Sequence, residues 1–247
     1  MSYILIGDSR SVAIAVSEGC SYKKFINARG KDGNHYYAKE GMGASWLKAN
    51  INQIVDASKG MDCIVIKMGG NDCTNPKAVQ NYIAAAEELQ RRTGKPIVFS
   101  STDPQLDNER SAKRKAFNQR IAAECQKRGW GYINTFDYAQ REINAHPNYV
   151  KPDGVHYNSP LNGMISKYMK QHFPDVSNQR RNKAVAEVSH EQTTQETMKK
   201  DKDKSNLLAE NEESGILNGN HVINIDEEKQ QVDLDLALLA MHNANGR

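Results

Sequence analysis

The chain has 247 residues, with 33 Lys and Arg against 30 Asp and Glu and a formal net charge of +3. This length suffices for one α/β domain with a sizeable buried core, plus an extension. No run of about 18 apolar residues occurs, which argues against a membrane-spanning helix and against a membrane partner.

Charge and composition divide the chain near residue 175. Residues 1–175 hold 24 Lys and Arg and 17 Asp and Glu, whereas residues 176–247 hold 9 and 13. All 17 aromatic residues and all seven prolines lie in the first part. The second part has too little apolar surface to offset the entropy of ordering it. We therefore predict a folded domain over 1–175 and a charged tail over 176–247 that is disordered or ordered only on a partner.

Two apolar islands interrupt the predicted tail, at residues 222–225 and 232–241. Both have the size of linear docking motifs, which indicates a protein partner bound through residues 220–242. An inert charged tail accounts for the composition equally well. The basic charges of the first part are scattered along the sequence, which argues against nucleic acid as a partner.

The four cysteines, at positions 20, 63, 73 and 125, form no Cys-x-x-Cys pair, and we interpret them as structural free thiols. The amino terminus lacks the basic region and long apolar region of a secretory signal. These features favour a cytoplasmic location. Packaging in a larger particle such as a virion would leave the same pattern.

Short apolar runs alternate with helical patterns along the first part. Buried strands are predicted at residues 3–6, 63–68 and 96–100, with a weaker one at 132–133. Helices are predicted over residues 44–57, 77–92, 109–128 and 160–172. The last helix has Ser159 as its expected N-cap and Pro160 at its first position. This alternation implies parallel β-α-β units and a three-layer sheet flanked by helices.

Polar motifs follow the first two predicted strands. Gly-Asp-Ser at residues 7–9 follows the first strand, and Gly-Gly-Asn-Asp at residues 69–72 follows the second. Ligands of such folds bind beyond the carboxyl ends of the strands, so Ser9 could be an exposed nucleophile there. The side-chain N–H of Asn71 could donate to a developing oxyanion. Each motif by itself also describes an ordinary turn.

Two further candidates complete a set of residues for acyl transfer. Asp153 and His156 stand three residues apart, so that the Asp can fix the tautomer of the His, although a surface loop would explain the pair equally well. Gly43 precedes a predicted helix and could supply a backbone N–H to the oxyanion. Gly41 is the alternative, and either glycine could serve the backbone conformation alone.

Taken in order, Gly-Asp-Ser at 7–9, Gly43, Gly-Asn-Asp at 70–72 and Asp-x-x-His at 153–156 resemble blocks I, II, III and V of the SGNH (GDSL-like) hydrolases. The resemblance covers residues 1–173. It implies a flavodoxin-like three-layer α/β/α sandwich around a central parallel sheet, followed by the C-terminal extension. It also implies a serine esterase with a catalytic triad and an oxyanion hole.

The resemblance assigns a role to each candidate residue. Ser9, Asp153 and His156 would form the triad, and Ser9, Gly43 and Asn71 would form the oxyanion hole. No cofactor is expected. No metal ion is expected either, because the chain has no His-x-His or His-x-x-x-His spacing.

Two positions depart from the usual pattern of the family. Arg10 follows the nucleophile where an aliphatic residue is common, and Tyr157 follows the His where Pro or Leu is frequent. We interpret Arg10 as a surface residue of the first helix, with selection of an anionic substrate as the alternative. Tyr36, Tyr37, Trp46 and Tyr157 are expected to pack in the core or at its rim rather than to stack on sugar rings.

These residues predict hydrolysis of small acyl groups such as acetyl from a small-molecule or glycan ester. The resemblance also includes lipases, thioesterases and arylesterases, but the chain shows no apolar lid. An α/β-hydrolase is disfavoured because Ser11 replaces the second glycine of its Gly-x-Ser-x-Gly elbow. A second hypothesis makes the chain a tail-anchored subunit of a larger assembly such as a virion, with the hydrolase-like domain as a glycan-binding module.

Overall fold

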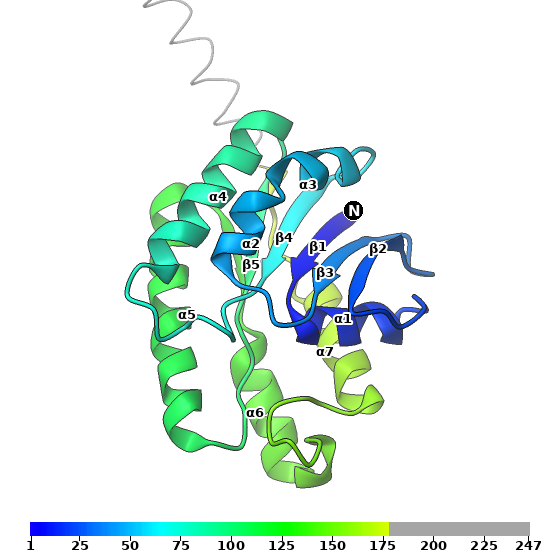
Figure 1. Cartoon of the computed structure of the whole chain (residues 1–247), viewed down its shortest axis with the longest axis vertical. Coiled ribbons are helices and arrows are strands. Elements are labelled where there is room, and N and C mark those ends of the chain that lie inside the picture. The colour runs from blue at the N-terminus through cyan, green and yellow to red at the C-terminus, as the bar shows by residue number, and fades with distance from the viewer. Residues whose placement is uncertain (178–247) are drawn as a thin grey trace, which may run out of the picture. The chain divides into compact units, whose positions relative to one another are not determined.

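The computed structural model describes residues 1–177, and Figure 1 shows their arrangement. Within these residues no helix is both long and apolar enough to cross a bilayer. The predictions made for the tail, including the apolar islands at 222–225 and 232–241, lie outside the described residues.

A six-stranded sheet forms the middle layer, in the order β2-β3-β1-β4-β5-β6. Its strands are β1 (Tyr3–Gly7), β2 (Phe25–Arg29), β3 (His35–Lys39), β4 (Cys63–Lys67), β5 (Ile97–Ser100) and β6 (Gly131–Ile133). The four predicted strands are confirmed as β1, β4, β5 and β6. They pair in parallel, with Leu5 opposite Val65 and Val65 opposite Val98.

Strands β2 and β3 were not predicted from the sequence, and β2 makes the sheet mixed. Strand β3 pairs in parallel with β1, whereas β2 pairs antiparallel with β3 at the edge of the sheet. Strand β2 buries Ile26 and leaves its other side chains exposed, so it lacks the continuous apolar run of a buried strand. The predicted parallel sheet is therefore corrected at this edge.

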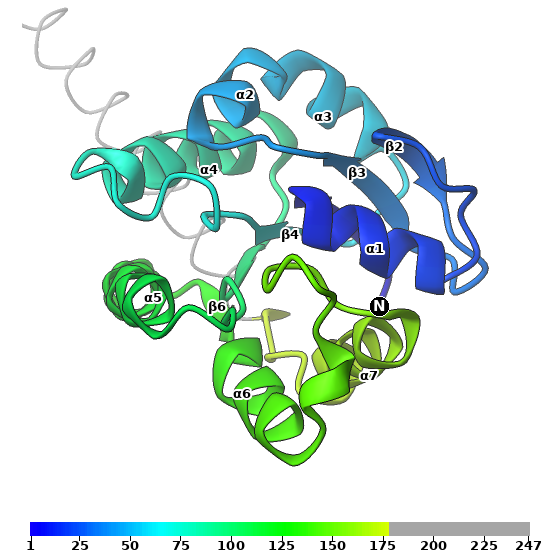
Figure 2. The ribbon, with the colours of Figure 1, turned by 60° about the horizontal axis from the view of Figure 1, so that its bottom comes forward.

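Helices cover both faces of the sheet, which confirms the three layers (Figure 2). They are α1 (Ser9–Ser17), α2 (Ala44–Ala49), α3 (Ile51–Ala57), α4 (Ala78–Thr93), α5 (Asn108–Arg128), α6 (Thr135–Ala145) and α7 (Ser159–Gln171), and a 3-10 turn spans Pro147–Tyr149. Helices α2 to α5 pack on one face, and α1, α6 and α7 pack on the other.

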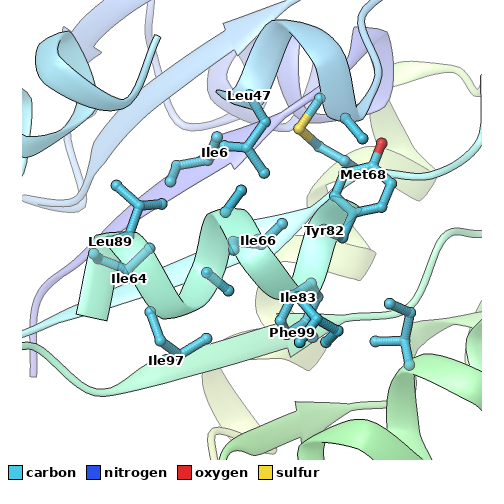
Figure 3. Close-up of a cluster of buried hydrophobic side chains, with 14 of the residues drawn as sticks. Ile6, Leu47, Ile64, Ile66, Met68, Tyr82, Ile83, Leu89, Ile97 and Phe99 are labelled. Carbon is cyan, nitrogen blue, oxygen red and sulfur yellow. The ribbon is translucent and has the colours of Figure 1, made fainter. Parts of the chain in front are cut away.

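The alternating side chains of each strand fill two separate cores. On β4, Ile64 and Ile66 point into the core beneath α4, as Figure 3 shows, while Val65 belongs to the core beneath α1 and α7. All three side chains are fully buried. Burying an aliphatic side chain of this size contributes about 1.5–3 kcal/mol, so this central strand anchors both layers.

Three helical predictions need correction. The helix predicted over 44–57 is divided at Asn50, whose side chain donates back to the carbonyl of Trp46. The N-cap of α7 is Asn158 rather than Ser159, because the Asn158 side chain accepts from the N–H of Leu161. Helix α6 was not predicted at all.

The predictions for the tyrosines, Trp46 and the cysteines are confirmed. Tyr36, Tyr37 and Tyr157 are buried, and Trp46 stacks on Tyr37 with ring centroids 5.5 Å apart. None of the four cysteines, all within the described residues, takes part in a disulfide, and three of them are buried. These side chains therefore serve packing.

Buried charges tie the carboxyl ends of the strands together. Lys67 Nζ, at the end of β4, lies 2.8 Å from Asp103 Oδ1 in the segment after β5. It also donates to the Ser101 carbonyl at 2.9 Å and to Thr135 Oγ1 at 2.8 Å. Burial lowers the pKa of Lys67, which Asp103 opposes. Since Thr135 begins α6, one ammonium group fixes three segments at this edge of the sheet.

Arg10 belongs to the same buried region, so its interpretation as a surface residue is wrong. Its side chain is 7% exposed and lies 3.9 Å from Asp103 Oδ2. Its guanidinium donates to the Tyr157 hydroxyl and to the carbonyl oxygens of Pro104 and Val155, each at 2.7 Å. It also packs 4.4 Å over the Tyr157 ring.

The two departures from the family pattern, Arg10 and Tyr157, are therefore partners of each other. Arg10 adjoins Ser9 in the sequence, and its contacts with Val155 and Tyr157 flank His156 on both sides. The Tyr157 hydroxyl donates in turn to the Pro104 carbonyl. This pair joins the start of α1 to the segment that carries His156.

We predict that Arg10→Leu destabilises the fold by about 3–5 kcal/mol, because it removes the buried guanidinium that donates to the Tyr157 hydroxyl and to two carbonyl oxygens and that faces Asp103. Tyr157→Phe keeps the ring and should cost about 1 kcal/mol. Chemical denaturation of both variants measures these differences. The exposed Arg120→Leu serves as the control, and an Arg10→Leu loss no larger than the control's would contradict the assignment.

Candidate active site

Ser9 lies at the turn between β1 and α1, at the carboxyl edge of the sheet. Asp8 caps the helix, since its Oδ1 accepts from the N–H of Arg10 at 3.1 Å. A Cβ atom at Gly7 would lie 1.8 Å from Ser11 Oγ, so the turn has room only for glycine. The tight turn leaves Ser9 half-buried at the start of the helix.

His156 and Asp153 form a hydrogen-bonded chain with Ser9. His156 Nε2 lies 2.9 Å from Ser9 Oγ, and His156 Nδ1 lies 2.8 Å from Asp153 Oδ2. The other carboxylate oxygen of Asp153 accepts from the backbone N–H groups of Val155 and His156, both at 2.8 Å. The structure thus brings together three predicted residues that are separated by almost the whole domain.

The loop that carries this pair is shaped by its own backbone. Gly154 has a φ of +69°, which favours glycine, and its N–H donates to the Lys151 carbonyl at 2.9 Å. The N–H of Lys151 donates in turn to the His156 carbonyl at 2.8 Å. The turn therefore folds Asp153 back beneath the imidazole.

Asp153 is held as a carboxylate although it is half exposed. The hydrogen bond from the His156 backbone N–H is the main reason that its pKa falls from 3.8 to about 2, and the His156 side chain adds to the effect. At neutral pH the group is a negative charge beside the imidazole. It can orient His156 and stabilise a positive charge on it.

Asn71 lies at the same edge and is tied to the loop before α2. Its side-chain Nδ2 donates to the Met42 carbonyl at 2.9 Å. The neighbouring Asp72 accepts from the Ala44 N–H at 2.8 Å and from the Tyr82 hydroxyl at 2.9 Å. An amide nitrogen carries two N–H groups, so the Met42 contact leaves one for a ligand.

The two glycine candidates differ in their surroundings. Gly41 lines the cavity beside Ser9 and has a φ of +72°. Gly43 is the N-cap of α2 and is not among the cavity-lining residues. A Cβ atom at Gly43 would lie 2.6 Å from Asp72 Oδ2, so packing alone requires glycine there.

A cavity of about 440 Å³ opens beside Ser9 and His156. One wall is the face of α1 formed by Ser9, Val12, Ala13 and Val16. Polar residues form much of the rest; they are Tyr22, Glu40, Asn71, Arg114, Lys151, Ser159 and Asn162. A space of this size and mixed lining suits a small-molecule substrate or a sugar unit.

Sequence reasoning missed several residues that line this cavity. Tyr22 and Glu40 form a rim through a 2.9 Å hydrogen bond, and Arg114 and Lys151 reach it from distant segments. No local motif marks them, because their position depends on how β3, α5 and the His156 loop come together.

A second Asp-x-x-His spacing, at Asp32 and His35, takes no part in the site. His35 lies at the amino end of β3 and contacts Asn27 at 2.7 Å. Asp32 accepts from the Tyr36 hydroxyl and pairs with Lys170. The spacing is therefore informative only together with its place in the fold.

Comparisons with known proteins show the family of the chain and structures of similar fold. Residues 7–160 match the GDSL-like Lipase/Acylhydrolase family. The fold is similar to a GDSL-like lipase from Bacteroides thetaiotaomicron, with a TM-score of 0.55 and 17% identity over 69% of this chain and 86% of that one. It is also similar to a putative acylhydrolase from Bacteroides fragilis, with a TM-score of 0.56 and 16% identity over 69% and 85%.

A third similar structure is a catalytic mutant of an acetylxylan esterase from Geobacillus stearothermophilus, with a TM-score of 0.51 and 16% identity over 70% of this chain and 94% of that one. At these identities the three structures show the fold alone. No curated protein matches the chain in sequence. The family match covers more than half of the chain, so this protein belongs to the GDSL-like lipase/acylhydrolase family and is an ester hydrolase.

Proposed function

We propose that the protein is a serine esterase in which Ser9 is the nucleophile, His156 the general base and Asp153 the group that orients the base. The continuous chain of hydrogen bonds from Asp153 through His156 to Ser9 is the observation that carries this proposal. Its distances of 2.8 and 2.9 Å are those of a nucleophile within reach of its base.

The reaction proceeds in two halves. His156 Nε2 takes the Ser9 proton as Ser9 Oγ attacks the ester carbonyl, and the same proton then passes to the departing alcohol. Water repeats the sequence on the acyl-enzyme, releasing the acid and restoring Ser9. The backbone N–H of Ser9 and the remaining side-chain N–H of Asn71 hold the oxyanion. The family resemblance makes the backbone N–H of Gly43 the third donor.

The lining of the cavity supports a small acyl group on a glycan or small-molecule alcohol. The apolar side chains of the lining are Val12, Ala13 and Val16 on α1 together with Val155, and hydroxyl, carboxylate, amide and amine groups lie among them. These polar groups can bond the hydroxyls of a sugar. The similar fold of an acetylxylan esterase supports acetyl as the group removed.

The alternative of a tail-anchored glycan-binding subunit depends on residues beyond 177. Within residues 1–177 no feature favours it over hydrolysis. The hydrogen-bonded chain at Ser9 is expected of an active enzyme.

We predict that Ser9→Ala lowers the hydrolysis of 4-nitrophenyl acetate by about 10⁴-fold or more, because it removes the attacking oxygen. Ser17→Ala, at the other end of the same helix, is the control and should keep wild-type turnover. A fluorophosphonate probe should label the wild type and the control but not Ser9→Ala. Equal turnover by wild type and Ser9→Ala would overturn the proposal.

Acyl chain length tests the substrate. We predict that kcat/KM is highest for 4-nitrophenyl acetate and falls about tenfold or more at the octanoate. The reason is that four small apolar side chains in a mixed lining cannot enclose a long acyl chain, each methylene of which contributes roughly 0.8 kcal/mol only when it is buried in apolar surroundings. Steady-state kinetics across acetate, butyrate and octanoate measures this. A maximum at octanoate would instead indicate a lipase or thioesterase.

Asp153→Asn should lower kcat by about 10²–10⁴-fold, because a neutral amide neither fixes the tautomer nor stabilises the imidazolium. The depressed pKa of Asp153, about 2, also links it to stability. Its contribution is fully present above about pH 4 and is lost as the pH falls toward 2. The stability difference between wild type and Asp153→Asn should therefore shrink over that interval in acid denaturation, and a constant difference would contradict the assignment.

A further inference from the structure

A second cavity, of about 260 Å³, adjoins the active site and is lined by three basic side chains. Gly70, Asn71 and Arg114 line both cavities, so a substrate held at Ser9 can extend into either. Arg110 and Lys113 complete the basic lining, which includes no Asp or Glu. We call this second cavity the basic pocket.

Arg114 is a buried cation without a carboxylate partner. It is 5% exposed, and its guanidinium donates to the carbonyls of Asp103 at 2.9 Å and Gly70 at 3.3 Å. Among residues 1–177 no carboxylate lies within 4.0 Å of it, although buried Asp8 acts on it from farther away. Buried charges in proteins are normally paired, so this guanidinium is suited to an anion brought by a ligand.

Arg110 and Lys113 are exposed and can turn toward a ligand. Arg110 lies 4.0 Å from Asp107, and Lys113 lies 2.5 Å from Glu109, both within the first turns of α5. Exposed pairs of this kind contribute only about 0.3–0.5 kcal/mol. A substrate anion can therefore compete for both basic groups.

Gln105 supplies an independent sign that the basic pocket holds a polar ligand. Its side chain lines the basic pocket and is 6% exposed, and its Oε1 atom has no hydrogen-bond partner among the described residues. An unpaired buried acceptor costs about 1–3 kcal/mol unless a donor reaches it. Since Oε1 itself has almost no accessible surface, a ligand hydroxyl can donate to it once the amide group turns toward the basic pocket.

We propose that the basic pocket binds a carboxylate of the substrate, which makes the natural substrate an acidic, hydroxyl-bearing ester such as an ester of an acidic glycan. This inference rests on the proposed esterase function. The three basic residues lie close together in the sequence on helix α5, and the fold places them beside Gly70 and Asn71, which also line the cavity at Ser9.

Two matched pairs of chromogenic esters test the inference. In the first, the carboxylate is on the alcohol part, and 3-acetoxy-4-nitrobenzoate is compared with 3-acetoxy-4-nitrobenzamide. In the second, it is on the acyl part, and the 2-nitrophenyl half-ester of adipic acid is compared with its terminal amide. At low salt the wild type should prefer the carboxylate in one pair by about tenfold in kcat/KM, and the preference should shrink at about 0.5 M NaCl.

The double variant Arg110→Ala/Lys113→Ala should reduce this preference at least about threefold. The control is Lys115→Ala/Arg120→Ala, which removes the same charges from exposed positions of α5 outside the basic pocket and should retain the preference. A preference in neither pair, or an equal loss in the control, would overturn the inference. Hydrolysis of the neutral benzamide ester by the wild type but not by Ser9→Ala tests the esterase proposal separately. A failed esterase proposal would abolish this difference, whereas a failed basic-pocket inference would leave it intact.

Discussion

The buried contact of Lys67 with Asp103 is the interaction on which the geometry of the site depends. Both side chains are almost fully buried, and such a pair is favourable only when further hydrogen bonds compensate the loss of hydration. Thr135 and the Ser101 carbonyl provide them. The carboxyl ends of β4 and β5 and the start of α6 are thereby fixed in one arrangement, against which the two catalytic segments can be placed.

Arg10 extends this arrangement to the catalytic residues. Its neighbour in the sequence is Ser9, and two of its hydrogen-bond partners flank His156, so a buried guanidinium connects the two segments that carry the proposed nucleophile and base. Family members with an aliphatic residue after the nucleophile have no such connection at that position. Here Arg10 and Tyr157 appear together because each satisfies the buried polar atom of the other.

The sequence predicts correctly those strands and helices whose local apolar pattern fits only one type of element. Continuous apolar runs identified β1, β4 and β5, because strands that are buried on both faces consist mainly of apolar side chains. The shorter β6 gave a weaker signal of the same kind. Edge strand β2 is exposed on most of its length, so its sequence carries no such mark. Helix α6 does carry a signal in the sequence, because its apolar residues Phe136, Ala139 and Ile143 recur at the three- and four-residue spacing of an amphipathic helix.

The sequence by itself determined which residues carry the proposed chemistry: a serine after the first strand, an amide after β4 and an Asp-x-x-His motif, each of a type suited to acyl transfer. Only the tertiary structure decided what surrounds them. The burial of Arg10 by Pro104 and Val155, and the placement of helix α5 with Arg110, Lys113 and Arg114 beside Gly70 and Asn71, depend on contacts between segments far apart in the chain. Local patterns report which side of an element is buried, but not which distant group lies against it.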